Sequence, residues 1–258
     1  MNGWGTRTEK ARRFNLFATI PAMPIEQIVQ QLQAECDRSD MHIETVIEEL
    51  QKERPIFHSE ADFQHALAWE VHLHYPKAAV RLEVGKQGLT GKEHIDILIR
   101  NGDIVWGIEL KYRTMELDIA VNSEKFSLCD QQSCDTARHD LINDIVRLER
   151  FVDAHPGAIG YVIFLTNDEN YWKETKRLDT NDAMLRIHEG RMLGHVLRWS
   201  EKAAAGTIGK RERQLTLRGS YQIHWSDYAE IEGEGPRKFR YVLLPVTDRV
   251  NVNKAIIV

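Results

Sequence analysis

The sequence predicts an α/β protein with a central mixed sheet that is flanked by helices. Three observations support this fold class. Segments with helical periodicity alternate with strand-like segments, three strand-like runs follow one another between residues 79 and 113, and residues 158–166 form a continuous apolar run. A run of the last kind is typical of a strand buried on both faces, and helices that alternate with strands usually cover the faces of a sheet.

Two amphipathic helices are predicted first, over residues 24–37 and 42–53. Pro24 suits the first turn of one helix, and Pro55 ends the other. We divide the chain into an N-terminal helical appendage (residues 1–56) and a larger domain (57–258), which consists of a core (57–166) and a C-terminal extension (167–258).

The core opens with a predicted helix that starts at Ser59 and ends before Pro76. Ser59 and Asp62, three residues later, resemble a capping box. The elements that follow are three strands, a helix and a strand, at residues 79–84, 94–100, 103–113, 135–153 and 158–166. The Asn-Gly-Asp stretch at 101–103 is a strong hairpin signal. The predicted order is therefore α-β-β-β-α-β.

The C-terminal extension has weaker patterns. Residues 183–203 are expected to be helical, and residues 214–225 are expected to pair as a strand with residues 239–246. Residues 206–218 are locally basic, and this segment is either a nucleic-acid contact or a solvated surface.

Composition places the chain among soluble globular proteins, with 42% hydrophobic and 28% charged residues. The formal net charge of −5 gives no global basic signature, which leaves only a local patch for nucleic-acid binding. No apolar run approaches the roughly 18 residues that span a membrane, and no apolar stretch of a secretory signal follows the N-terminus. Three cysteines give no disulfide framework. We expect a cytoplasmic protein with no membrane partner.

Charged residues interrupt the apolar pattern of the second and third core strands. Side chains alternate between faces along a strand, so Gly107, Glu109 and Lys111 share one face. If the hairpin matches the apolar faces of its strands, Asp96 lies on the same side. Gly107 would leave room there for a ligand or another backbone. The alternative is a solvated sheet face with a cross-strand ion pair.

These residue types suit phosphate chemistry. Two carboxylates at the ends of strands bind Mg²⁺, a hard cation that favours oxygen ligands and keeps several waters. Such a metal lowers the pKa of a bound water and neutralises charge that develops on a phosphate. A lysine beside it can orient or activate the attacking water and stabilise the transition state.

Asp96, twelve intervening residues and then Glu109-Leu110-Lys111 resemble the D…ExK core of the PD-(D/E)xK superfamily, the restriction-endonuclease-like nucleases. The predicted αβββαβ order is also similar to the core of that superfamily, although Ile95 stands where the motif's proline would be. The resemblance implies a restriction-endonuclease-like fold. It also implies a nuclease that depends on Mg²⁺, with Mn²⁺ as a substitute, and that leaves a 5′-phosphate.

The resemblance implies roles for individual residues. Asp96 and Glu109 would bind the metal with the carbonyl of Leu110 as a further ligand, and Lys111 would position the attacking water. Glu60 matches an acidic residue that many members carry near the start of the first core helix and that contributes to metal binding. The alternative for Glu60 is favourable charge at a helix N-terminus.

Nucleic acid is the expected partner, with DNA as the first expectation. A net-acidic chain must concentrate positive charge locally to neutralise phosphates, so we expect contacts from Arg113, Lys210, Arg211 and Arg213. A homodimer is an open option, because cutting both strands commonly takes two sites. The alternatives are a catalytically inactive nuclease fold that binds DNA and an interaction protein with no nucleic-acid partner. The charges of the helix at 135–153, Arg138, Asp144, Arg147 and Glu149, are interpreted as helical ion pairs.

Overall fold

The computed structural model describes residues 41–248 apart from residues 86, 88, 90, 132 and 178. The chain divides into the units Met1–Met41 and His42–Val258, and every described helix and strand belongs to the second unit. The helix expected at residues 24–37 lies outside the described residues.

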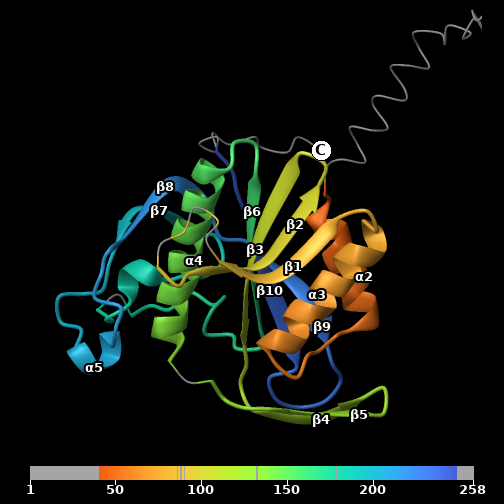
Figure 1. The fold of residues 1–258 in the computed structure, drawn as a ribbon. Coiled ribbons are helices and arrows are strands. Elements are labelled where there is room, and N and C mark those ends of the chain that lie inside the picture. The colour runs from red at the N-terminus through yellow and green to blue at the C-terminus, as the bar shows by residue number, and fades with distance from the viewer. Residues whose placement is uncertain are drawn as a thin grey trace, which may run out of the picture. The chain divides into compact units, whose positions relative to one another are not determined.

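A mixed sheet forms the centre of the second unit, as the sequence predicts (Figure 1). Its six strands run in the spatial order β1-β2-β3-β6-β10-β9. Their bounds are Ala79–Gly85 (β1), His94–Asn101 (β2), Ile104–Arg113 (β3), Ile159–Thr166 (β6), Trp225–Glu230 (β9) and Lys238–Val246 (β10). β3 and β6 are parallel, and all other neighbours in this sheet are antiparallel.

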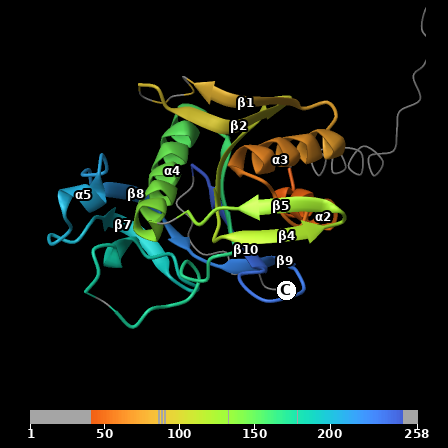
Figure 2. The same cartoon turned by 90° about the horizontal axis from the view of Figure 1, so that it is seen from below.

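Helices cover both faces of this sheet (Figures 1 and 2). Helix α4 (Cys134–Ala154) packs on β3 and β6 from one side, and helix α3 (Glu60–His74) packs on β1, β2 and β3 from the other. Helix α2 (Ile43–Glu53), which we assigned to the appendage, packs against α3. Because β3 and β6 are parallel, α4 is the crossover that returns the chain to the sheet.

The sequence marks the start of α3 through its cap. The Ser59 hydroxyl accepts a hydrogen bond from the Asp62 N–H at 3.2 Å, as in a capping box. The reciprocal bond differs, because the Asp62 carboxylate accepts from the N–H of His58 at 2.9 Å and pairs with Arg54. Asp62 therefore fixes the entry to α3, and its neighbour Glu60 is left to face the sheet.

Two hairpins lie outside the central sheet. The first, β4 (Leu117–Val121) with β5 (Glu124–Leu128), was not predicted, although its turn residues Asn122 and Ser123 both have positive φ, as in a type I′ turn. The second pairs β7 (Met192–Leu197) with β8 (Leu215–Gln222) beside α4.

Two predictions for the C-terminal extension are wrong. Residues 183–203 are not a long helix, because they contain only the 3₁₀ turn η1 (Ala183–Leu185) and strand β7, and the nearby helix α5 (Ala205–Ile208) is short. Strand β8 pairs with β7, whereas β10 pairs with β6 and β9. The apolar run at 239–246 thus forms an inner strand of the sheet, a long-range pairing that a local alternation pattern does not encode.

None of the helices in the described ranges has the length and apolar character needed to cross a membrane.

Candidate functional site

Strands β2 and β3 stop pairing at one end of their hairpin. Two carboxylates accept hydrogen bonds from the edge of β3 that is left unpaired there. Paired residues run from Asn101 and Ile104 only as far as Ile97 and Ile108. Beyond that point the Asp96 carboxylate accepts a hydrogen bond from the Leu110 N–H at 2.7 Å. A buried backbone N–H needs an acceptor, so the Asp96 side chain replaces the strand partner that β3 lacks.

Glu60 repeats this arrangement two residues further along β3. From the first turn of α3, its carboxylate accepts a hydrogen bond from the Tyr112 N–H at 2.8 Å. Tyr112 in turn donates its hydroxyl to the Phe57 carbonyl at 3.0 Å, which fixes the start of α3 against the strand. Glu60 is therefore more than a favourable charge at a helix end, since it lies along the same strand edge as Asp96.

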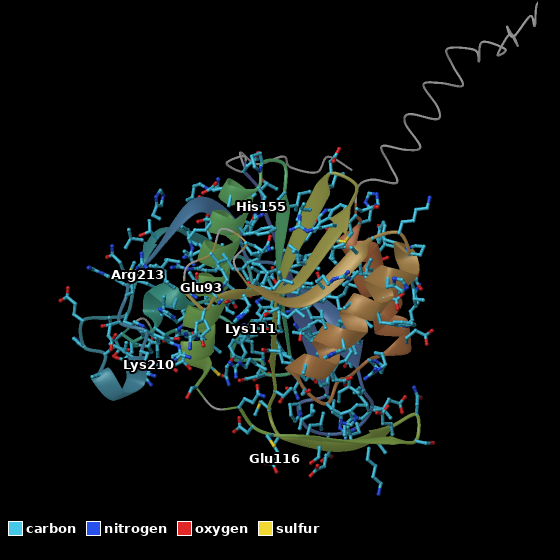
Figure 3. The ribbon with its side chains drawn as sticks, viewed as in Figure 1. Glu93, Lys111, Glu116, His155, Lys210 and Arg213 are labelled. Atoms are coloured by element: carbon cyan, nitrogen blue, oxygen red, sulfur yellow. The ribbon has the colours of Figure 1, made fainter. Side chains whose placement is uncertain are left out.

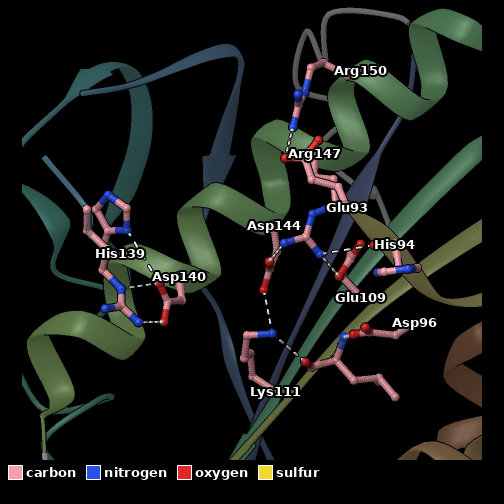
Figure 4. Close-up of polar contacts among 12 residues, drawn as sticks. Glu93, His94, Asp96, Glu109, Lys111, His139, Asp140, Asp144, Arg147 and Arg150 are labelled. Carbon is pink, nitrogen blue, oxygen red and sulfur yellow. Dashed lines mark hydrogen bonds and ion pairs between the residues drawn. The ribbon is translucent and has the colours of Figure 1, made fainter. Parts of the chain in front are cut away.

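Glu109 and Lys111 face α4, where they meet charges of opposite sign (Figure 4). Glu109 Oε2 lies 2.5 Å from Arg147 Nη1, and Lys111 Nζ lies 2.9 Å from Asp144 Oδ2. Arg147 Nη2 also pairs with Asp144 Oδ1 at 2.9 Å. Glu109 is completely buried and the Asp144 side chain is 2% exposed. The group is therefore a buried ion cluster and not a solvated sheet face.

Sequence reasoning did not assign the α4 pair to the site. The predicted helical ion pairing is present between Asp144 and Arg147, although each of the two also bonds to β3. It is wrong for Arg138, which pairs with Asp182, and for Glu149, which accepts hydrogen bonds from β8. The spacing of three residues between Asp144 and Arg147 looks the same on an ordinary helix surface. A usable signal was that each lies one helical turn before a buried apolar residue, Leu148 for Asp144 and Phe151 for Arg147.

Burial and crowding of charge raise the pKa values of two carboxyl groups. Burial raises the pKa of Asp96 to about 6, with opposing contributions from the Leu110 N–H and from Lys111. Burial, together with the charges of Asp144 and Asp96, raises the pKa of Glu109 well above its usual range. Asp96, Glu109 and Asp144 share this cluster with two cations, Lys111 and Arg147, and Glu60 adds further negative charge beside Lys111, so the carboxyl groups outnumber the cations.

Lys111 stays protonated in this environment. Burial acts to lower its pKa, but the charges of Asp144, Glu60 and Asp96 outweigh that effect and raise it. Its ammonium group also donates to the Leu110 carbonyl at 3.0 Å. Lys111 can therefore orient a nucleophile or stabilise negative charge, but it is not a base that removes a proton.

The fit to a divalent metal depends on oxygen atoms that the fold leaves available. Glu109 Oε1 is buried and, among the described residues, has no hydrogen-bond partner. The Leu110 carbonyl follows Glu109 along β3, and the Asp96 carboxylate, which bonds to the Leu110 N–H, is close enough to Glu109 to raise its pKa. This stretch of the two strands therefore carries three oxygen donors of the kind that a hard cation prefers. No group of three or more His, Cys, Asp or Glu side chains suited to a metal occurs in the part of the chain that the structure describes. Two carboxylates and one carbonyl would leave the remaining positions to water.

We had expected Gly107 to leave room for a ligand or another backbone, but a side chain of α4 fills this space. A Cβ at this position would lie 2.8 Å from Cε1 of Phe151, a fully buried ring of α4. The glycine instead lets α4 approach β3 closely, which brings Asp144 and Arg147 within reach of the strand.

The residues predicted to contact nucleic acid have different surroundings. Lys210 and Arg213 are exposed and lie toward α5 and β8, while Lys111 lies between α4 and the sheet (Figure 3). Arg211 pairs with Asp140 of α4 through two contacts of 2.6 Å. Arg113 ends β3 and is half-buried. These positions bring Arg211 to a structural contact and leave Lys210 and Arg213 accessible.

A pocket of about 210 Å³ lies against the face of α4 next to the ion cluster. Its lining includes Arg150 and Arg213 together with the polar side chains Asn143 and Thr216. Arg150 binds Glu93 at 2.7 Å, and the next residue along the chain, His94, bonds through its carbonyl to Arg147 at 3.3 Å. The pocket and the cluster are therefore neighbours along both α4 and the start of β2.

No protein-family model, curated protein or solved structure matches this chain. Its function has to be argued from the geometry of the site.

Proposed function

We propose that this protein is a Mg²⁺-dependent nuclease that hydrolyses phosphodiester bonds of DNA. The observation that carries the proposal is the convergence of Asp96, Glu109 and Lys111 at the open end of one hairpin, with a buried carboxylate oxygen left unpaired within the described residues. Structural carboxylates are normally satisfied, whereas an unsatisfied one beside a lysine is suited to a cation and a phosphate.

The arrangement of the surrounding elements supports a restriction-endonuclease-like core. From α3 through β1, β2, β3 and α4 to β6 the order is αβββαβ, with the β4–β5 hairpin inserted before α4. The sequence resemblance implies this order, and it implies the same two strands as the carriers of the acidic residues.

Each residue then has a distinct task. Asp96, Glu109 and the Leu110 carbonyl hold the metal, which supplies charge neutralisation at the phosphate and an acidified water. Glu60 keeps β3 open at its edge through Tyr112 and adds negative charge beside Lys111. Lys111, as a fixed cation, orients the attacking water and stabilises charge on the phosphate.

The pocket beside α4 gives the DNA strand a route away from the reacting phosphate. Arg213 enters it from the segment before β8, and Arg150 enters it from α4. A guanidinium matches the geometry of a phosphate, and neutralisation of phosphates dominates DNA affinity. We assign this pocket, and not the whole basic segment, to contact with the DNA backbone.

DNA cleavage in Mg²⁺ or Mn²⁺ tests the proposal. Wild type should cut duplex or single-stranded DNA, while Asp96→Asn and Lys111→Met should lose at least about a thousandfold in rate. Arg237→Gln is a matched control, because within the described residues that side chain bonds only to the carbonyls of Glu232 and Glu234 in its own loop. Equal cleavage by all four proteins, or none under any metal and substrate, would exclude the catalytic assignment.

A binding module with the same fold is the second candidate. It is favoured by the Arg147 guanidinium, which occupies one oxygen of Glu109 in the place where a metal-dependent site needs a free carboxylate. This candidate predicts DNA binding that survives Asp96→Asn and calorimetry that detects no Mg²⁺ binding. Metal binding that is lost in Asp96→Asn would reject it.

A further inference from the structure

Arg147 is a charged residue of the cluster that has no role in the chemistry proposed above. We propose that Arg147 occupies Glu109 only while the metal is absent, and that it binds the phosphate of the substrate once the metal has taken that carboxylate. This inference rests on the proposed function, because it requires that Glu109 is a metal ligand.

Arg147 makes contacts of two kinds, because a metal on Glu109 would replace one of them and leave the others. Nη1 lies 2.5 Å from Glu109 Oε2 and also donates to the His94 carbonyl at 3.3 Å, and Nη2 lies 2.9 Å from Asp144 Oδ1. Glu109 has no other polar partner among the described residues. Asp144 is different, because it also binds Lys111 at 2.9 Å and so remains paired whatever happens at Glu109.

Charge explains why Arg147 and a metal ion would not contact Glu109 at the same time. A buried carboxylate without a counter-charge is strongly unfavourable, so Arg147 stabilises the metal-free protein. A divalent cation on Glu109 would supply that counter-charge and would repel a guanidinium in contact with the same carboxylate. Arg147 and the metal are therefore competitors for Glu109.

Asp144 keeps the displaced guanidinium at the site. It binds Lys111 and Arg147 through different oxygen atoms, so it tethers both cations on the side of β3 that carries Glu109. The Arg147 side chain is 17% exposed, which leaves its planar fork a path toward solvent and a bound phosphate. Arg147 would then stabilise phosphate charge next to Lys111, and Asp144 is the positioning residue for both.

Titration of Mn²⁺ in the absence of DNA tests the competition. Arg147→Gln should bind Mn²⁺ about tenfold more tightly than wild type, and it should gain more in Tm when the metal is added. Arg237→Gln is the matched control, because it removes the same charge outside the cluster, from a side chain that bonds to the carbonyls of Glu232 and Glu234 in its own loop. It should bind Mn²⁺ as wild type does. Arg147→Lys, which keeps the charge but lacks the fork, guards against misfolding and should fall between wild type and Arg147→Gln.

DNA affinity with and without a metal tests the second half. With EDTA, wild type and Arg147→Gln should bind an oligonucleotide equally; with Ca²⁺, the variant should bind about tenfold more weakly. An equal loss under both conditions would overturn the phosphate role. Unchanged Mn²⁺ affinity in Arg147→Gln beside a wild type that binds Mn²⁺ would overturn this inference alone. A wild type that binds no metal would overturn the proposed function as well.

Discussion

Glu149 of α4 and Glu109 of β3 are both buried carboxylates, at 4% and 0% exposure, but their surroundings differ. Glu149 accepts three hydrogen bonds from neutral groups: the N–H of Arg218 at 2.9 Å, the N–H of Gly219 at 2.8 Å and the hydroxyl of Tyr221 at 2.8 Å. Glu109 contacts one guanidinium through one oxygen, and its other oxygen has no partner in the described chain.

The difference separates a carboxylate with a structural role from the carboxylate to which we assign the proposed function. Three fixed donors hold Glu149 between α4 and β8, so both of its oxygens are satisfied and none is available to a ligand. The surroundings of Glu109 instead raise its pKa and leave one oxygen unused. Burial alone does not distinguish Glu149 from Glu109. The number of carboxylate oxygens that have a partner does distinguish them.

The largest expected effect is on catalysis. Glu109→Gln should reduce DNA cleavage by at least about a thousandfold, because an amide is a poor ligand for Mg²⁺. Stability should be little changed, since the neutral side chain avoids the penalty that raises the pKa of Glu109. Cleavage rates and thermal unfolding of the same preparation measure both effects. Retained cleavage in Glu109→Gln would place Glu109 with the structural carboxylates.

Glu149→Gln should show the opposite pattern. Replacing one oxygen by an NH₂ group sets a donor against the Arg218 N–H or against the donors from Gly219 and Tyr221. We expect a loss of about 2–3 kcal/mol in the free energy of unfolding, with cleavage per folded molecule unchanged. Urea unfolding followed by circular dichroism provides the measurement. A stable Glu149→Gln variant that no longer cuts DNA would remove the distinction.

The sequence predicted one of these two regions much better than the other. Asp96, Glu109 and Lys111 were found because a two-residue period and a tight hairpin are local signals, and both act within residues 94–113. The helices and strands from 42 to 166 were predicted for the same reason, except the hairpin β4–β5. The contacts of Glu149 join α4 to β8, about 70 residues apart, and no local pattern encodes them.

The same limit explains why Arg147 and Asp144 were interpreted as helical ion pairs and not as part of the site. Their helix was predicted correctly, but the side of α4 that faces β3 is set by tertiary packing, including the contact of Phe151 with Gly107. The apolar run at 239–246 was recognised as a strand, yet its partners β6 and β9 depend on long-range pairing. Local periodicity determines the elements, whereas the partners of buried charges depend on how those elements pack.

Asp96→Asn sharpens the comparison through pH. Because the pKa of Asp96 is raised to about 6 in the folded protein from 3.8, the folded state holds the proton more tightly. The carboxyl group therefore costs stability as pH rises from about 4 through 6, and the cost is complete above that range. Asparagine can still accept from the Leu110 N–H but carries no charge. In EDTA at pH 7.5 the variant should be more stable than wild type by about 2 kcal/mol.

Thermal unfolding of both proteins across pH 4 to 8 measures this difference. The two curves should approach one another as the pH falls toward 4, where Asp96 is protonated in the folded state and titrates in the unfolded state. Removing the charge of Asp96 also lowers the pKa of Glu109, which adds to the stability of the variant at the high end of this range. A variant that is less stable than wild type at pH 7.5 would show that Asp96 serves the fold, as Glu149 does.

The smallest expected effect concerns the pocket of about 210 Å³ that residues of α4 and residues around the start of β8 line. Arg150 and Arg213 are among its lining residues. Arg213 lies just before β8, the strand that supplies the hydrogen-bond donors for Glu149. Arg213→Gln should weaken DNA binding a fewfold and reduce the salt dependence of the affinity by about one ion, without altering Mn²⁺ affinity. Arg237→Gln, in another exposed loop, is the control and should leave both unchanged. Fluorescence anisotropy at several salt concentrations measures the slope. An unchanged slope would show that this pocket does not contact DNA. The region around Glu149 would then have a structural role only, and DNA would have to bind on the other side of the site.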